Sequence, residues 1–202
     1  SHIKNDVLFI EQNSPNKEML KGKDTINIYI PQEKRINNLG VKVVNGNISM
    51  TNQLITNYNF DLGESVMIIK DTKIDNYVGD GDFVNTELNN SSIKNINYAG
   101  FKGKMDIINT NIEAANLKLE DSYNFLMNNA IIGNLNIEGS KVVLDLNLND
   151  IHSYIFTSEK DLTKYGFEKN IEEKYVYNPQ GDFEMNININ DVKIKNINIY
   201  KE

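Results

Sequence analysis

The chain has 202 residues, of which 40% are hydrophobic and 24% charged, and no apolar run approaches the ~18 residues of a membrane span. This composition predicts one soluble globular domain and disfavours disorder and membrane insertion. The net charge of −7 and the single arginine, Arg35, disfavour a nucleic-acid surface, and the absence of cysteine excludes disulfides and thiolate chemistry.

Asparagine and isoleucine are unusually frequent, with 34 and 27 copies. Isoleucine is stiff at χ1 and suits strands, whereas asparagine disfavours helix interiors and tolerates the left-handed conformation of turns. The pair therefore predicts short strands joined by corners. AT-rich codon usage would produce the same bias, and composition alone leaves that explanation open.

Residues 1–38 are expected to supply the first coils of the fold or a cap. Val7 to Ile10 and Thr25 to Pro31 have strand character, and the second segment carries isoleucine at every other position. Pro31 ends that strand because proline cannot donate to a strand ladder. Asn13 to Asp24 contains a proline and a glycine and is expected to be a loop.

Residues 39–150 carry an internal repeat. Asp106 to Ser122 aligns without gaps with Asn124 to Ser140 at an offset of 18, which places Leu117 on Leu135. Further upstream the phrase returns at steps of 21 and 19 residues. Such periods predict a solenoid, in which each unit buries its apolar face by stacking on its neighbours.

Each repeat contains a corner. Ile194 and Ile197, in a phrase that echoes Ile93 to Tyr98, lie three positions apart, so a flat strand would place them on opposite faces. A bend at Lys195-Asn196 is needed to turn both inward. The sequence thus predicts an all-β solenoid with roughly six coils of 18–21 residues between Leu39 and Asp150. One column of asparagines is expected, as an amide ladder or as tolerated turn residues. Its members are Asn76, Asn95, Asn116 and Asn134.

Residues 151–184 interrupt the repeat with an aromatic excursion, and residues 185–202 return as closing strands, all within one domain. The excursion is expected to be a hairpin or a short helix, since Ser158 to Gly166 begins with a capping residue and ends with glycine. Tyrosines of the excursion could stack on neutral glycans, although packing against the solenoid is favoured. They are Tyr154, Tyr165, Tyr175 and Tyr177.

Histidine chemistry is sparse. A zinc site built from His2 and His152 would need carboxylates that show no recognisable spacing. Ser153 follows His152, but neighbours in a strand point to opposite faces, and the sequence has no nucleophile elbow. Neither a zinc site nor a serine hydrolase is therefore expected.

Gly79-Asp80-Gly81-Asp82 could begin a calcium loop. Counted from Asp80, Ser91 occupies the twelfth position, where a bidentate glutamate belongs, so an acidic β-turn is favoured. The sequence thus predicts no catalytic residue, no metal ligand, no cofactor-binding residue and no cofactor.

The order of these segments resembles a bacterial adhesin family. The resemblance is carried by Ile26-Asn27-Ile28-Tyr29-Ile30-Pro31, by Leu39 to Ser49, and by the asparagine- and glycine-rich coils, aromatic excursion and closing strand that follow. It extends from about Val7 to Ile199. It implies a single-stranded right-handed β-helix in an envelope-associated protein of low-GC bacteria, with no established reaction and no motif of functional residues.

These observations predict a non-enzymatic module at the cell surface, held to the membrane in the full-length protein by an anchor outside this chain. The expected partner is an unknown protein or glycan of the cell envelope, contacted through the aromatic excursion, and no nucleic acid. The alternative is a polysaccharide lyase or glycosidase, since 28 carboxylates could supply a catalytic pair. The negative charge and the single arginine disfavour enzymes that act on acidic sugars.

Overall fold

The computed structural model describes residues 2–4, 7–9, 34–190 and 193–200, which fall into two compact units. In the unit of residues 1–31, strands β1 (His2–Lys4) and β2 (Val7–Phe9) pair antiparallel as a hairpin. Val7–Phe9 is therefore a strand, as predicted, but its described partner is β1 and not a stacked coil. Ile10, the Asn13 to Asp24 loop and the Thr25 to Pro31 strand lie outside the described residues.

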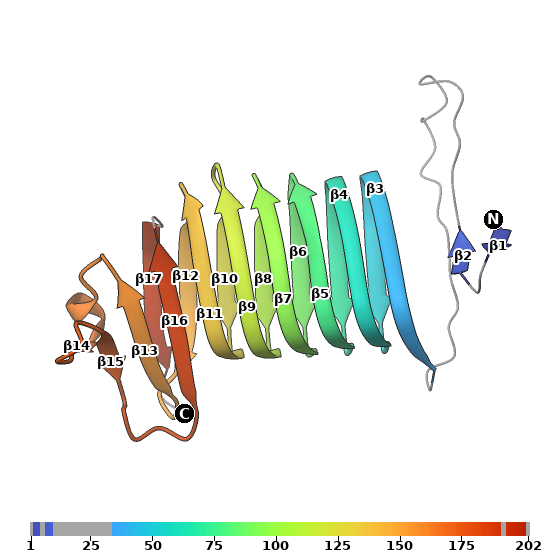
Figure 1. The fold of residues 1–202 in the computed structure, drawn as a ribbon. Coiled ribbons are helices and arrows are strands. Elements are labelled where there is room, and N and C mark those ends of the chain that lie inside the picture. The colour runs from blue at the N-terminus through green and yellow to red at the C-terminus, as the bar shows by residue number, and fades with distance from the viewer. Residues whose placement is uncertain (1, 5–6, 10–33, 191–192, 201–202) are drawn as a thin grey trace. The chain divides into compact units, whose positions relative to one another are not determined.

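The second unit, residues 32–202, is a β-solenoid of parallel coils (Figure 1). The first two coils are single long strands, β3 (Arg35–Thr51) and β4 (Leu54–Lys70). Each of the next four coils consists of two strands separated by a corner: β5 (Lys73–Asp82) and β6 (Val84–Asn89), β7 (Ser92–Phe101) and β8 (Lys104–Ile108), β9 (Asn111–Glu120) and β10 (Asn124–Asn128), and β11 (Ile131–Ser140) and β12 (Val143–Asn149). The predicted solenoid of about six coils is confirmed.

The solenoid has two faces that meet in β4. Strands β5, β7, β9 and β11 stack in register on one side, here called the first face, and β6, β8, β10 and β12 stack on the other, the second face. Alternate side chains point inward from both faces, so Ile93, Ile96 and Leu117 are buried while Lys118 is exposed. Ile93 and Ile96, in the phrase that Ile194 to Ile199 echoes, both enter the core.

The stacking register differs from the predicted offsets. Ile74 pairs with Ile93 at the predicted step of 19, but Leu117 pairs with Tyr98 and Ile137, at separations of 19 and 20, and not with Leu135. The predicted steps of 18 and 21 were each wrong by two residues. A shift of two leaves every side chain on its original face, so period-two alternation cannot detect this error.

One inserted residue lengthens the coil between β9 and β11. The turn after β7 uses a single left-handed residue, Lys102 with φ 47°, whereas the turn after β9 uses two, Asp121 and Ser122 with φ 51° and 72°. Ser122 is thus an extra residue within the turn, and the stacking step grows from 19 to 20.

Asparagines form more than one column. Asn38, Asn57, Asn76 and Asn95 stack in one ladder, in which each amide Nδ2 donates to the Oδ1 of the preceding coil at 2.9, 2.9 and 3.2 Å. Ala114 occupies the next level and interrupts that ladder before Asn134. Asn134 therefore lies in the predicted column, although Ala114 separates it from Asn95, whereas Asn116 belongs to a separate ladder and was wrongly placed.

Buried hydroxyls satisfy the backbone at the turns that lead into the first face. In these turns Asp71, Asn90, Asn109 and Asn129 have φ between 48° and 51°. The hydroxyls of the residues that follow, Thr72, Ser91 and Thr110, each accept from the backbone amide one coil earlier at 3.2–3.3 Å and donate to a carbonyl of their own coil at 2.7–2.9 Å. At the next level Ala130 replaces the hydroxyl residue.

Aromatic rings fill the core of the early coils. Phe60 lies between Tyr58 and Tyr77, with centroid distances of 5.2 and 4.7 Å. Tyr58 donates to Met67 Sδ at 3.3 Å, and the Tyr123 hydroxyl donates to that of Tyr98 at 3.2 Å. Buried aromatic rings, which the sequence did not predict here, therefore take much of the place expected for isoleucine.

The C-terminal end departs from simple stacking. Strand β13 (Ser153–Ser158) follows β12 in the chain but does not pair with β11 on the first face. Strand β16 (Glu184–Asn190) instead lies between β11 and β13 and pairs with both. Strand β17 (Lys193–Tyr200) stacks on β12 with an irregularity at Lys195, where the bend was predicted, and Ile194 and Ile197 both pack against the core. The predicted closing strands thus complete the last coil. No helix in the described segments is long and apolar enough to cross a membrane.

The excursion between β13 and β16 contains β14 (Glu168–Lys169) and β15 (Tyr175–Tyr177), and β15 pairs antiparallel with β13. Of the two expected alternatives, antiparallel hairpin pairing forms and the helix from Ser158 does not, since only a 3₁₀ turn, η1 (Thr163–Tyr165), forms before Gly166 stops it at φ 87°. Asp161 Oδ1 accepts from both the backbone amide and the hydroxyl of Thr163, at 2.9 and 2.8 Å, and this local pairing competes with a helical turn.

Leu117→Asp is expected to destabilise the protein by several kcal/mol, because it buries a charge without a partner between coils. Lys118→Asp, on the exposed side of the same strand, should change the free energy of unfolding by less than about 1 kcal/mol. Urea denaturation of both variants measures the difference. Equal losses would contradict the inward face of β9.

The buried tyrosines should couple stability to alkaline pH. Burial raises the pKa of Tyr98 and of Tyr154 to about 12, and it also raises the pKa of Tyr58, Tyr77 and Tyr123. Because the folded pKa lies above the unfolded value of about 10, the stabilisation from these protons is complete below pH 10 and declines as the pH rises further. For Tyr98 and Tyr154 the loss falls between about pH 10 and 12, and for the other three it continues to higher pH. Tyrosinate absorbance and circular dichroism, recorded together, should show late ionisation accompanied by unfolding. Titration of all ten tyrosines near pH 10 in a protein that stays folded would refute this coupling.

Candidate functional site

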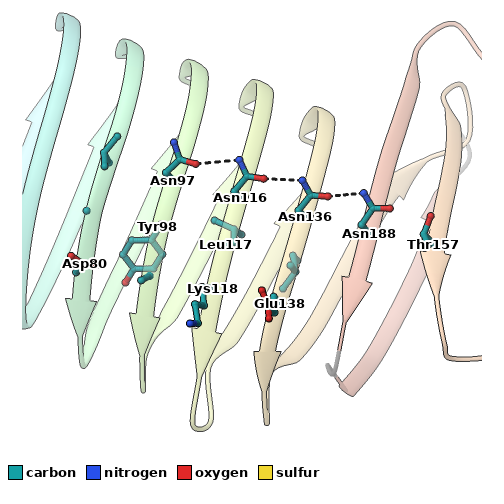
Figure 2. A pocket seen from close by; sticks show the side chains of 14 residues that line it. Asp80, Asn97, Tyr98, Asn116, Leu117, Lys118, Asn136, Glu138, Thr157 and Asn188 are labelled. Atoms are coloured by element: carbon teal, nitrogen blue, oxygen red, sulfur yellow. Dashed lines mark hydrogen bonds between the residues drawn. The ribbon is translucent and has the colours of Figure 1, made fainter.

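A groove of about 640 Å³ crosses the outer side of the first face, from β5 to β13 (Figure 2). Its length follows the stacking direction, so each coil contributes equivalent positions. Two rows of outward side chains line it. The first row contains Val78, Asn97, Asn116, Asn136, Asn188 and Thr157, and the second contains Asp80, Ala99, Lys118 and Glu138.

The first row contains a continuous amide ladder. Asn116 Nδ2 donates to Asn97 Oδ1 at 3.1 Å, Asn136 donates to Asn116 at 2.8 Å, and Asn188 donates to Asn136 at 2.6 Å (Figure 2). An asparagine amide has two N–H donors and two acceptor lone pairs. Within the ladder, Asn116 and Asn136 each use one donor and accept one hydrogen bond. Each therefore keeps one donor and one lone pair for a ligand.

The second row is mixed in charge and uneven in height. Ala99 lies between Asp80 and Lys118, and Glu138 follows Lys118. The methyl group of Ala99 makes a low point between two longer side chains. Two carboxylates and one ammonium give the row no strong preference for a charged ligand.

The sequence missed most of this groove. Asn116 was expected in an asparagine column, but its partners are Asn97, Asn136 and Asn188. Asn188 comes from β16, 52 residues beyond Asn136, and no fixed repeat step connects the two. The only usable signal was the alternation of asparagine with apolar residues in both segments.

Asp80 and Asp82 do not form the predicted acidic turn. Both lie in strand β5, exposed on either side of buried Gly81, and the corner comes one residue later at Phe83, with φ 60°. The glycines have a packing role. A Cβ at Gly79 would lie 2.6 Å from the Phe60 ring, and one at Gly81 would collide with the Tyr98 hydroxyl. The pattern Gly-Asp-Gly-Asp therefore reflects the aromatic core and not a loop.

The described residues contain no cluster of three or more His, Asp or Glu side chains able to hold a metal ion. Asp80 contributes to the groove, whereas His2 lies in β1 of the other unit. Ser153 is buried at the start of β13, and no hydrogen bond between described side chains joins it to His152.

The tyrosines of the excursion pack against the core and are not exposed to solvent as a stacking surface. Tyr154 and Tyr175 are buried, and Tyr165 and Tyr177 are partly buried against the core. Tyr154 Oη also donates to the Asn149 carbonyl at 2.8 Å. The favoured packing interpretation is confirmed for Tyr154 and Tyr175, and the groove on the first face is the better candidate site.

Comparison with known families places the chain in one of them. The family model described as Toastrack DUF4097 matches residues 4–201, nearly the whole chain, and the protein therefore belongs to the Toastrack family. A search of curated proteins found no match, and neither did a search of solved structures. The expected adhesin assignment and bacterial lineage have no support from these comparisons.

Gly81→Ala is expected to destabilise the fold by about 1 to 3 kcal/mol, because the added methyl meets the Tyr98 hydroxyl and lies 3.0 Å from Val84 Cγ2. The cost should fall in a Tyr98→Phe background, which removes the hydroxyl. Thermal denaturation of the double-mutant cycle measures this coupling. Gly40→Ala is the control, since a Cβ there meets nothing within 4 Å. An undiminished cost in the phenylalanine background would contradict the packing role.

Proposed function

We propose that this Toastrack domain is a non-enzymatic interaction module of the cell envelope, with an adhesion-type role, which binds an extended neutral glycan along the groove of the first face. The observation that carries the proposal is the amide ladder of Asn97, Asn116, Asn136 and Asn188. Its donors and acceptors recur at the coil spacing of about 4.8 Å.

Amides and sugars have matching chemistry. Each interior asparagine offers one donor and one acceptor, and a sugar hydroxyl can serve as both. The ladder also fixes each amide in place before a ligand arrives, which lowers the entropy cost of binding. Few aromatic surfaces are exposed in the groove, since Tyr98 is only 3% exposed. Recognition would therefore depend mainly on hydrogen bonds.

The groove carboxylates are poorly placed for hydrolysis. Asp80 on β5 and Glu138 on β11 are three strand positions apart, which corresponds to about 14 Å at ~4.8 Å per strand. A glycosidase pair needs about 5 to 9.5 Å. This separation supports a binding role over the glycosidase alternative.

Four carboxyl groups outside the groove have lowered pKa values, which do not suit them as general acids. Hydrogen bonds to the charged form are the largest cause in each case, and they lower the pKa of Asp75, Asp121, Asp161 and Glu172. A general acid working at neutral pH needs a raised pKa.

The proposed location is the cell surface, with the chain held to the membrane through an anchor elsewhere in the full-length protein. The resemblance of the coils, excursion and closing strand to a bacterial adhesin family supports this location. A protein ligand in the same groove, or a role as a spacer, would be distinguished by the binding experiment.

The double variant Asn116→Ala/Asn136→Ala should bind glycans about thirtyfold more weakly than wild type, since it loses at least two hydrogen bonds that contribute about 1 kcal/mol each. Glycan arrays and pull-downs with peptidoglycan identify the ligand, and calorimetry then measures the affinity. Circular dichroism before each measurement ensures that only folded protein is compared.

The matched control is Asn47→Ala/Asn85→Ala, which removes two exposed asparagines from β3 and β6, away from the groove. Its affinity should equal that of wild type. Three results would overturn the proposal: no glycan bound by the wild-type protein, equal affinity in the groove variant, or measurable turnover of a polysaccharide.

A further inference from the structure

A second cavity, of about 320 Å³, lies where the first face meets the turn after β12. Its volume falls at the lower end of small-molecule sites, which span roughly 300 to 1,000 Å³. It is distinct from the groove, since the two share no lining residue. Its polar lining is Asn90, Asn109, Asn111, Asn129, Asn149 and His152.

The cavity coincides with a break in the repeat. In earlier coils a buried hydroxyl follows the left-handed turn residue, and Thr110 is the last of these. Ala130 takes the next level and lines the cavity. Strand β12 then runs on to Asn149, and the following turn brings in His152 instead of another regular coil.

The asparagines around the cavity are held in position. Asn90, Asn109 and Asn129 have φ values of 48° to 49°, and the stacked turns fix that conformation. Asn129 Nδ2 donates to Asn109 Oδ1 at 2.9 Å, and Asn90 donates to Asp71. The Asn149 Oδ1 accepts from the Ile151 amide at 3.1 Å. These bonds order the amides before any ligand binds.

The lining contains no Asp, Glu, Lys or Arg side chain. Amide side chains offer both donors and acceptors to an uncharged polar molecule, and the lining adds no carboxylate, ammonium or guanidinium group to attract an ion. The His152 ring adds a partly apolar surface. It packs edge-on against Tyr154 and Phe183, with distances between ring centroids of 6.5 and 6.4 Å. Amides beside an aromatic ring suit a sugar, which has hydroxyl edges and C–H faces.

We infer that this cavity binds one neutral sugar residue, either as a free monosaccharide or at the end of a glycan chain. Asn109, Asn111 and Asn129 supply hydrogen bonds to the hydroxyls, and the His152 ring contacts a C–H face. This site does not require the groove on the first face to bind anything.

The test is an NMR titration of ¹⁵N-labelled protein with glucose, galactose and N-acetylglucosamine, and with short oligosaccharides that end in each. Millimolar additions of at least one neutral sugar should shift the backbone amides of Asn111 and His152. Response to the monosaccharide alone identifies a free-sugar site, and response only to the oligosaccharide identifies a chain-end site. Glucuronate should bind more weakly than glucose, because the lining offers no cation to its carboxylate.

Two variants test the residues. Asn111→Ala removes an exposed amide. His152→Phe keeps an aromatic ring at this position while removing both ring nitrogens. His152 Nδ1 is buried without a hydrogen-bond partner among the described residues, so His152→Phe should leave the melting temperature unchanged or raised. Asn111→Ala should weaken binding about tenfold. In His152→Phe, which retains the ring face, affinity should fall less.

Asn85→Ala is the control for an exposed asparagine elsewhere, and it should bind as wild type does. Asn116→Ala/Asn136→Ala should also retain cavity binding, which separates failure of this site from failure of the groove. Absence of shifts with every neutral sugar, or an unchanged affinity in Asn111→Ala, would overturn the inference.

Discussion

Backbone hydrogen bonds between successive parallel coils are the constraint on which the rest of this structure depends. They place residues 19 or 20 positions apart directly above one another, so each position along a coil becomes a column. Residues of the same kind in a column then stabilise one another. Amides hydrogen-bond to amides, hydroxyls accept hydrogen bonds from backbone N–H groups, and apolar side chains pack on apolar side chains. A chain with 34 asparagines can therefore fold around a core, because ladder positions satisfy its polar groups.

The sequence could predict the architecture because strand alternation and the repeat carry that information directly. The inward face of Leu117 and the corner before Ile197 followed from spacing alone. The exact stacking partners could not be predicted in this way. A shift of two residues along the strand leaves the alternation of inward and outward side chains unchanged. Locating Ser122 as an inserted turn residue requires backbone angles, which no pattern of residue types contains.

The candidate site was less predictable than the fold. Asn97, Asn116 and Asn136 lie at regular steps, but Asn188 joins them only because β16 enters the sheet between β11 and β13. Gly81 was also misinterpreted from the sequence. It was expected in a turn, but it lies in a strand and leaves room for the side chain of Tyr98. In both cases the deciding neighbour comes from a different coil, and local sequence cannot identify it.

The insertion of β16 has a consequence for the order in which the molecule folds. Neighbouring coils meet across only 19 or 20 residues, whereas β11 and β16 meet across about 52. Closing the longer loop costs only about 0.8 kcal/mol more in chain entropy, so it limits stability little. Contacts between distant segments form slowly, however. The pairing of β16 also requires a space one strand wide between β11 and β13. The central coils can therefore assemble first as a short-range nucleus, with the C-terminal coil locking into place last.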